Sequence, residues 1–255
     1  MGRDEKKIRE IIAPLEGAKY EGKEPLGPHI DDLVRLYLKI KKRFCVSVLE
    51  FGLGYSTFVI AQALKENKER WDALENKPEA RRTDMFQLHS IECSGQWATE
   101  IVERLPESLY DVIRILHCRP YTALLNNQLC HLYDLLPDVV PDFIYLDGPD
   151  PAQVQGSIQG LSFQCPERTP MTADPLIMES TMLPGTMILI DGRTQNARFL
   201  ARNFQRNWDV RELWEEDVTI FELCEPRLGS INSTGMDILW EIKHAPKETH
   251  RRRKT

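Results

Sequence analysis

Four acidic residues stand at the ends of short apolar runs, where their side chains could do chemistry together. Glu50, Glu92, Asp147 and Asp191 each close such a run. A carboxylate can accept a proton, bind hydroxyl groups, attract a cation or coordinate a divalent metal ion. If the runs are parallel strands of one sheet, their carboxyl ends meet at one edge, so these side chains surround one crevice.

A glycine turn follows the first of these acids. Gly52 and Gly54 let the backbone approach a ligand closely, and they precede a helical pattern whose first amides can bind a polar group. A dinucleotide fingerprint would have Gly or Ala at the third position, where this chain has Thr57. Glu50, directly before the turn, would repel a pyrophosphate and attract an ammonium or sulfonium group. The turn therefore favours a cationic ligand.

The other three acids suggest two further roles. Glu92 is suited to accept hydrogen bonds from ribose hydroxyls, and the alternative is a solvated charge that opens the next helix. Asp147 and Asp191 are each followed by Gly. Neighbouring strands lie about 4.8 Å apart, so these two carboxylates could share a divalent cation. The alternative is that each caps a helix or shapes a turn.

Strand-like and helix-like segments alternate along most of the chain. Nearly continuous apolar strands between helices indicate a parallel sheet that is covered on both faces. Residues 150–173, rich in Pro, Gln, Gly and Ser, predict a long loop that contributes to the acceptor pocket. Apolar runs predict strands over 46–51, 86–93, 112–118, 143–146 and 187–190, and periodicity predicts helices over 4–13, 29–43, 56–64, 97–105, 127–136, 176–183 and 196–204.

The last third of the chain predicts antiparallel pairing. Segments 209–214 and 218–224 are separated by only three residues, which is too short for a crossover helix. Segment 238–243 is a further strand-like piece at that edge. We therefore predict an α/β fold: a doubly wound, mostly parallel seven-stranded sheet with a C-terminal antiparallel hairpin and N-terminal cap helices. The predicted parts are cap helices over 1–45, a ligand-binding domain over 46–245 and a basic disordered tail over 246–255.

Composition excludes several classes of function. The chain of 255 residues has a formal net charge of -6, which argues against nucleic-acid binding. It contains no run of about twenty apolar residues, so we expect no membrane span. The six cysteines have wide, irregular spacings without a Cys-x-x-Cys pair, which indicates reduced thiols in a cytoplasmic protein and no structural zinc site.

Together these motifs resemble the class I, Rossmann-like S-adenosyl-L-methionine-dependent methyltransferases. The resemblance rests on EFGLGYS after the first strand, IEC at the second, YLDGPD at the fourth and the closing hairpin WDVRELWEEDVTIFELC. The third strand ends His117-Cys118-Arg119, without the small acidic residue that is usual in that family. By resemblance, the cofactor would contact Glu50, Gly52, Gly54 and Ser56 at its methionine moiety, Glu92 at its ribose, Cys93 and His117 near its adenine, and Asp147.

Within that family, Asp147 and Asp191 resemble the acids of magnesium-dependent small-molecule O-methyltransferases of the catechol and caffeoyl-coenzyme A types. Those enzymes usually have Asn or Asp directly after the second acid, where this chain has Gly192, so Asn196 is the alternative ligand. The resemblance implies transfer of a methyl group to a hydroxyl of a small molecule, either with Mg2+ bound by Asp147 and Asp191 or without a metal.

Methyl transfer to a hydroxyl needs in-line approach of the nucleophile and removal of its proton. Asp147 is the candidate base or metal ligand, and His29 and Arg193 are further catalytic candidates. The alternatives are that His29 is a capping or surface residue and that Arg193 makes a surface salt bridge.

Two other classes of function remain open from the sequence. An NAD(P)-dependent oxidoreductase would explain the glycine turn and Glu92, but the third Gly or Ala and a Tyr-x-x-x-Lys pair are missing. A non-catalytic nucleotide-binding module would keep the fold without the reaction, and polyamine-synthase-like transfer would use the same cofactor. The expected partner is a small-molecule acceptor, such as a sugar or a phenol, and the interpretation leaves room for a homodimer.

Overall fold

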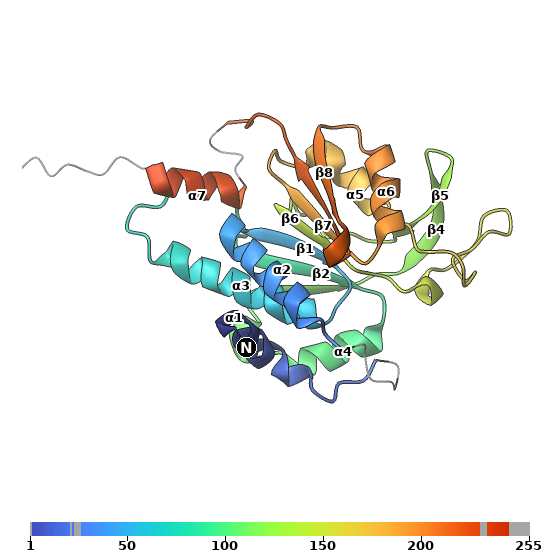
Figure 1. The fold of residues 1–255 in the computed structure, drawn as a ribbon, viewed down its shortest axis with the longest axis horizontal. Coiled ribbons are helices and arrows are strands. Elements are labelled where there is room, and N and C mark those ends of the chain that lie inside the picture. The colour runs from blue at the N-terminus through green and yellow to red at the C-terminus, as the bar shows by residue number, and fades with distance from the viewer. Residues whose placement is uncertain (1, 21, 23–26, 230–233, 245–255) are drawn as a thin grey trace, which may run out of the picture.

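The computed structural model describes residues 2–20, 22, 27–229 and 234–244 (Figure 1). Its centre is a seven-stranded sheet in the order β3-β2-β1-β6-β7-β9-β8. The first five strands in this order are parallel, whereas β9 runs antiparallel to both β7 and β8. The predicted fold class is confirmed, including the closing hairpin. The strands are β1 Ser47–Phe51, β2 Gln87–Glu92, β3 Ile113–His117, β6 Phe143–Leu146, β7 Met187–Asp191, β8 Trp208–Leu213 and β9 Val218–Leu223.

Helices cover both faces of the sheet, as a doubly wound fold requires. Alternate strand residues point to opposite faces, so Val48 of β1 joins the core on one side and Leu49 joins the core on the other. Every residue of β1 is buried. One face carries α1 Arg3–Ile12, α2 Ile30–Arg43, α3 Tyr55–Asp72 and α4 Gly95–Arg104, and the other carries α5 Asp174–Met178 and α6 Thr194–Asn203.

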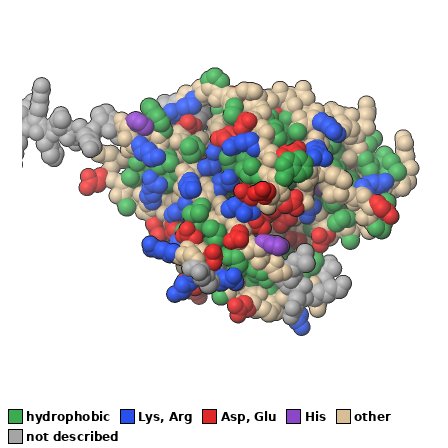
Figure 2. Space-filling view, in the orientation of Figure 1, with side chains coloured by type: hydrophobic (Ala, Val, Ile, Leu, Met, Phe, Trp, Pro, Cys, Tyr) green, Lys and Arg blue, Asp and Glu red, His purple; other side chains and the backbone are tan. Residues whose placement is uncertain are grey.

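The predicted cap helices α1 and α2 pack into the first of these layers. Leu33, Leu36, Tyr37 and Ile40 form a buried stripe along α2, and this stripe belongs to the same core as α3 and the sheet. Basic side chains are enriched in the last turn of α2, where they suit the helix dipole, and Figure 2 shows Lys and Arg gathered over this part of the surface. The basic tail predicted over 246–255 lies outside the described residues.

One predicted helix is wrong: segment 127–136 forms a strand. It contributes β5 Gln128–Tyr133, which pairs antiparallel with β4 Pro120–Leu125 in a separate two-stranded sheet. Asn126 and Asn127 connect the two strands with φ values of 50° and 58°. Two consecutive left-handed residues give the tight turn that suits a twisted hairpin, and Asn tolerates this conformation well. The hairpin projects beside α6 at one end of the molecule (Figure 1).

A second prediction is also wrong, because segment 238–243 is helical. It lies within α7 Gly235–His244, whose Ile238 and Leu239 are buried against Phe44 and Phe86. A Cβ at Gly235 would lie 2.0 Å from the carbonyl oxygen of Phe44, so this helix starts in close backbone contact.

Two other predicted regions, 176–183 and 150–173, differ in detail from the structure. The helix predicted over 176–183 is shorter and starts earlier, with α5 followed by a 3-10 turn at Glu179–Thr181. Loop 150–173 contains one 3-10 turn at Pro151–Gln153 and isolated β-bridges at Gln155, Ile158, Leu161 and Thr172. Within the described ranges, no helix has the length and apolar character needed to cross a membrane.

Candidate functional site

The floor of the candidate site is bare backbone from two strand-end loops. Gly52 has φ +104°, a conformation that favours glycine. A Cβ at Gly148, after β6, would lie 3.0 Å from both the Gly52 nitrogen and the Phe51 oxygen. At Gly54 the backbone is extended, with φ 173°, and a Cβ would meet nothing within 4 Å. The loops after β1 and β6 therefore pack directly on each other, and open space lies next to Gly54.

The backbone amides of the glycine turn already have partners within the protein. Gly52 donates to the Ile91 carbonyl at 2.9 Å, Leu53 donates to Glu92 Oε2 at 3.1 Å, and Gly54 donates to Thr57 Oγ1 at 3.0 Å. A ligand can thus approach this turn through the open space at Gly54, but not through these three amides as they stand.

Glu50 is a buried acid beneath the turn. Its carboxylate is 0% exposed and accepts hydrogen bonds from Ser56 Oγ at 2.6 Å, Thr57 Oγ1 at 2.8 Å and Ser90 Oγ at 2.6 Å. Burial raises the pKa of Glu50 to about 7, although the three hydroxyls oppose this rise, and the charge of Asp147 adds to it. Glu50 therefore holds the start of α3 in place, and its contact with a ligand stays a prediction. Thr57 replaces the fingerprint glycine because it bonds both Glu50 and the turn.

Glu92 fastens the same turn to the end of β2. In addition to the Leu53 amide, its carboxylate accepts the amides of Cys93 at 2.8 Å and Ser94 at 2.6 Å. Burial raises the pKa of Glu92, and the amides oppose the rise. Ribose hydroxyls would have to share oxygens that already accept three bonds, so the ribose role stays a prediction.

The two residues predicted near an adenine ring lie together. His117 Nε2 is 3.0 Å from the Cys93 carbonyl oxygen, and the Cys93 thiol donates to Gln153 Oε1 at 3.0 Å. Burial raises the pKa of the Cys93 thiol, so it stays protonated. Next to them, Trp97 donates from Nε1 to the Leu53 carbonyl at 2.8 Å. These bonds join the end of β2 to Gln153 and hold Trp97 against the glycine turn.

Asp147 and Arg193 form the centre of the site. The Asp147 side chain is 56% exposed, whereas that of Arg193 is only 15% exposed. Arg193 donates from Nη2 to the Asp147 carbonyl at 2.6 Å and from Nη1 to the Pro149 carbonyl at 3.1 Å, and its Nε lies 3.6 Å from Asp147 Oδ1. Surrounding protein raises the pKa of Asp147 to about 6; Arg193 opposes the rise and Asp191 adds to it.

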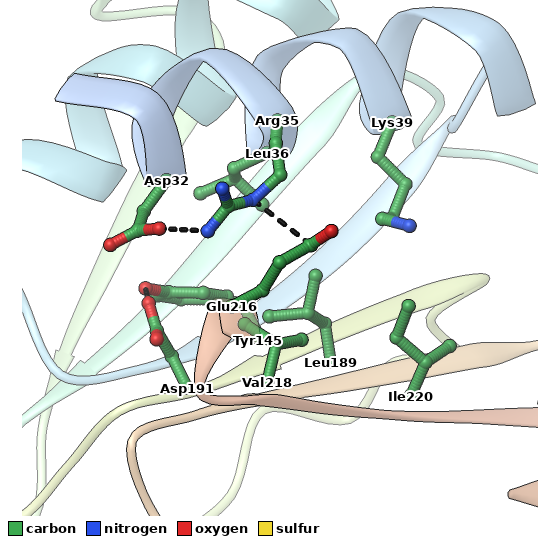
Figure 3. Close-up of a pocket in the computed structure, with 10 residues that line it drawn as sticks. All are labelled: Asp32, Arg35, Leu36, Lys39, Tyr145, Leu189, Asp191, Glu216, Val218 and Ile220. Atoms are coloured by element: carbon green, nitrogen blue, oxygen red, sulfur yellow. Dashed lines mark hydrogen bonds and ion pairs between the residues drawn. The ribbon is translucent and has the colours of Figure 1, made fainter. Parts of the chain in front are cut away.

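Asp191 faces the opposite direction, towards α2. The Tyr145 hydroxyl donates to Asp191 Oδ2 at 2.7 Å, at one end of a cavity of about 20 Å³ (Figure 3). Across this cavity, Arg35 pairs with Asp32 and, at 3.1 Å, with Glu216. Burial raises the pKa of Asp191, the Tyr145 hydroxyl opposes the rise, and Asp32 adds to it.

These surroundings do not fit a divalent cation bound by Asp147 and Asp191. A guanidinium stands beside the first carboxylate, and a phenol hydroxyl occupies the second. Asn196, the alternative ligand, is buried and bonds the backbone of Thr172 at 3.0 and 3.1 Å. Nowhere in the described part of the chain do three His, Cys, Asp or Glu side chains gather as a metal-binding set.

His29 stands apart from this centre. It is the exposed residue that precedes α2, and its side chain makes no capping hydrogen bond. The structure places it three residues before Asp32, on the α2 side of the crevice, so its catalytic role stays a prediction.

The mispredicted hairpin supplies two residues that the sequence analysis missed. His131 is fully buried, and its Nε2 lies 3.1 Å from Thr172 Oγ1, which also donates to the Gly148 carbonyl at 3.3 Å. Tyr133 lies next to it, and its ring centroid is 5.7 Å from that of Phe51 at the end of β1. The Asn126-Asn127 pair is the sequence signal that could have predicted this hairpin and so placed His131 and Tyr133.

Loop 150–173 borders a second, larger space. A groove of about 330 Å³ lies between this loop, β5 and the first turn of α6. Its lining mixes apolar and polar side chains: Leu129, Phe163, Cys165, Glu167, Arg168, Thr169, Met171 and Gln195. This volume is at the lower end of the range for small-molecule sites.

Charge decides which ligand the crevice fits. Glu50, Glu92, Asp147 and Asp150 stand at the ends of three adjacent strands, with Arg193 as their cation. Burial raises the pKa of Glu50 and that of Asp147, and neighbouring acids add to both rises. A ligand that carries an ammonium and a sulfonium group would relieve this repulsion, so the residues fit S-adenosylmethionine.

Comparison with known proteins gives structural likeness only. Neither a family model nor a curated protein sequence matches this chain. Solved structures that it resembles include the O-methyltransferase TomG from Streptomyces achromogenes in complex with S-adenosylmethionine (13% identity, 88% of this chain and 91% of that chain covered, TM-score 0.45). Two others are the methyltransferase PaMTH1 from Podospora anserina (10%, 88% and 89%, TM-score 0.48) and a putative caffeoyl-CoA O-methyltransferase from Staphylococcus aureus (13%, 88% and 93%, TM-score 0.46).

Proposed function

We propose that this chain binds S-adenosylmethionine in the crevice at the carboxyl ends of β1, β2 and β6, and transfers its methyl group to a hydroxyl of a small molecule. The observation that carries the proposal is the ring of acids around the open space at Gly54. Burial raises the pKa of Glu50 and that of Asp147, neighbouring acids add to both rises, and the positive charge of this ligand would oppose them. A pyrophosphate-containing cofactor would add to the repulsion.

When bound, S-adenosylmethionine supplies a methyl group on a positively charged sulfur. Asp147 then has the position and the protonation state of a general base. Its carboxylate is exposed in the crevice, and a pKa of about 6 leaves it mostly ionised at neutral pH, so it can take the proton of an acceptor hydroxyl. Glu50 and Glu92 hold the turn in place from below and from the side.

The groove beside loop 150–173 is the proposed place for the acceptor. Its apolar side chains would bury the body of a small molecule, while Thr169, Arg168 and Gln195 would bind polar substituents. Loops beyond the ends of parallel strands commonly carry specificity of this kind.

The proposal is tested by titrating the chain calorimetrically with S-adenosylmethionine, S-adenosylhomocysteine and NAD+. We expect saturable binding of the first two and none of the third. Binding of NAD+ alone would favour an oxidoreductase, and binding of none of them would contradict the proposed cofactor site.

A further inference from the structure

The guanidinium of Arg193 lies where the sequence pattern predicts a divalent metal ion. We infer that Arg193 takes the place of that metal as a built-in cation, and that the transfer under the proposed function uses no divalent ion. The inference rests on the proposed function for its catalytic meaning. The occupancy of the position by Arg193 is a property of the chain alone and can be tested without any cofactor.

The backbone brings Arg193 to this position. Leu146 of β6 pairs with Ile190 of β7, so Asp147 directly follows β6 while Asp191 is the last residue of the neighbouring strand β7. Arg193 follows two residues later, directly before α6, and its side chain turns back over the end of β6. Such a return places a fixed positive charge above the first of the two acids.

Three oxygens of one turn surround the guanidinium. The Asp147 and Pro149 carbonyls accept hydrogen bonds from Nη2 and Nη1, and Asp147 Oδ1 lies 3.6 Å from Nε. Carbonyl and carboxylate oxygens are also the donors that a hard divalent cation would use. These bonds use one hydrogen on each Nη atom, so each keeps a second N–H for a ligand.

The positive charge of Arg193 acts on the neighbouring His131. Burial, together with the charge of Arg193, lowers the pKa of His131 to about 3. The ring of His131 therefore stays uncharged and does not compete with the guanidinium. Meanwhile Asp191, the second predicted metal ligand, bonds the Tyr145 hydroxyl.

The reaction balances without a metal. The acceptor oxygen forms a bond to the methyl carbon while the bond from that carbon to sulfur breaks, and the sulfur keeps the electron pair. The hydroxyl proton passes to Asp147. The remaining N–H groups of Arg193 donate to the acceptor oxygen as negative charge develops on it, which is the task that a metal ion performs in metal-dependent enzymes.

The test uses Mn2+ alone as the probe, with binding followed by thermal shift and by the electron paramagnetic resonance signal of the ion. We expect no saturable binding to the wild-type chain. In Arg193→Ala the oxygens of Asp147 and Pro149 lose their built-in cation, so we expect a saturable rise in melting temperature of about 2 °C or more. The double variant Arg193→Ala/Asp147→Asn should lose this response.

The matched control is Arg198→Gln, on the same helix, where the guanidinium lies 3.6 Å from Glu212 and over the Trp214 ring. This variant should behave as wild type. Two results would overturn the inference. One is Mn2+ binding by the wild-type chain that is lost in Asp147→Asn, and the other is an Arg193→Ala variant whose melting temperature does not rise with Mn2+.

A second measurement does not depend on metal binding. In Arg193→Gln, an NMR titration of the Asp147 carboxyl carbon should give a pKa higher than in wild type, because the stabilising cation is gone. An unchanged pKa would contradict the inference. Failure of the proposed function would look different, since it would abolish binding of S-adenosylhomocysteine and leave both of these results intact.

Discussion

Asp147 joins an exposed carboxylate to a raised pKa, which is the combination that a general base at neutral pH needs. Two other acids, Glu50 and Asp191, are less exposed than Asp147. Glu50 is enclosed by three hydroxyls, and Asp191 is bonded to Tyr145. Glu50 and Asp191 therefore hold the site or set its charge, whereas Asp147 is exposed at the end of β6.

The pH dependence of turnover should report Asp147. Only the ionised carboxylate can accept a proton, so the rate should fall as pH drops through about 6 and level off above it. Asp147→Asn should lower the rate by about 100-fold or more. The measurement is formation of S-adenosylhomocysteine, with an acceptor that supports turnover, between pH 5 and pH 8.

Asp150→Asn is the control, because the charge of Asp150 adds to the raised pKa of Asp147 but Asp150 is not the proposed base. The limb near pH 6 should move to lower pH in this variant while the plateau rate is kept. A wild-type rate that does not change across the range would rule out Asp147 as the base.

Glu50 should make the stability of the fold depend on pH. Its pKa is about 7 in the folded chain, against 4.5 for a glutamate exposed to water in the unfolded chain, so the folded state holds the proton more tightly. The corresponding stability is present in full below pH 4.5 and is lost as pH rises through about 7. The difference amounts to roughly 3 kcal/mol in the free energy of unfolding.

Glu50→Gln removes this titration. Urea unfolding at pH 4.5 and pH 8 should show that the wild-type free energy of unfolding falls more between the two conditions than that of the variant, by an amount on the order of 3 kcal/mol. Parallel behaviour of the two proteins would mean that Glu50 is not held with a raised pKa.

At the scale of elements, the loops after β1 and β6 are built as a pair. Gly148 is needed for their contact, whereas Gly54 faces open space. Substitution by Ala should therefore lower stability at Gly148 and lower affinity for the proposed ligand at Gly54.

Gly148→Ala should cost about 1–3 kcal/mol in the free energy of unfolding, because its Cβ would press on the Gly52 nitrogen and the Phe51 oxygen. Gly54→Ala should change stability by less than about 0.5 kcal/mol. Its methyl group would nevertheless occupy the proposed cradle, and we expect a loss of about tenfold or more in affinity for S-adenosylhomocysteine. Full affinity in Gly54→Ala would move the ligand away from this turn.

Much of the element order was predictable because the signals are local. Each parallel strand is a short apolar run that ends in an acid or a turn, and three residues between 214 and 218 permit only a hairpin. Segment 127–136 was wrongly predicted as a helix because Leu129, Leu132 and Leu136 are spaced with a helical period. Its turn depends on two left-handed Asn residues, and its strand pairs with β4 and, through His131, with Thr172.

The partners of the site residues could not be read from the sequence. The motif around Glu50 predicts that it lies next to a ligand, but the fold surrounds its carboxylate with hydroxyls from α3 and β2. Likewise, the sequence does not tell whether Arg193 forms a surface ion pair or bonds the carbonyls after β6, because the direction of its side chain depends on the fold. Such contacts join elements far apart along the chain, so no local pattern encodes them.

At the scale of the whole molecule, the topology of the sheet explains where the acidic residues gather. The parallel strands deliver their acids to one edge of the sheet, while α7 covers hydrophobic residues beside the start of β1, at the opposite end of the strands. An acidic crevice in a chain of net charge -6 favours a small cationic ligand over a polyanion. The central claim is therefore that positive charge on the cofactor complements these carboxylates.

The most direct measurement is calorimetric titration with S-adenosylmethionine at about pH 6.5, between the pKa values of Asp147 and Glu50, in two buffers that differ in ionisation enthalpy. A bound cation lowers both pKa values, so we predict binding with net release of protons and tighter binding at pH 8 than at pH 5.5. Absence of binding, or binding that takes up protons, would contradict the account.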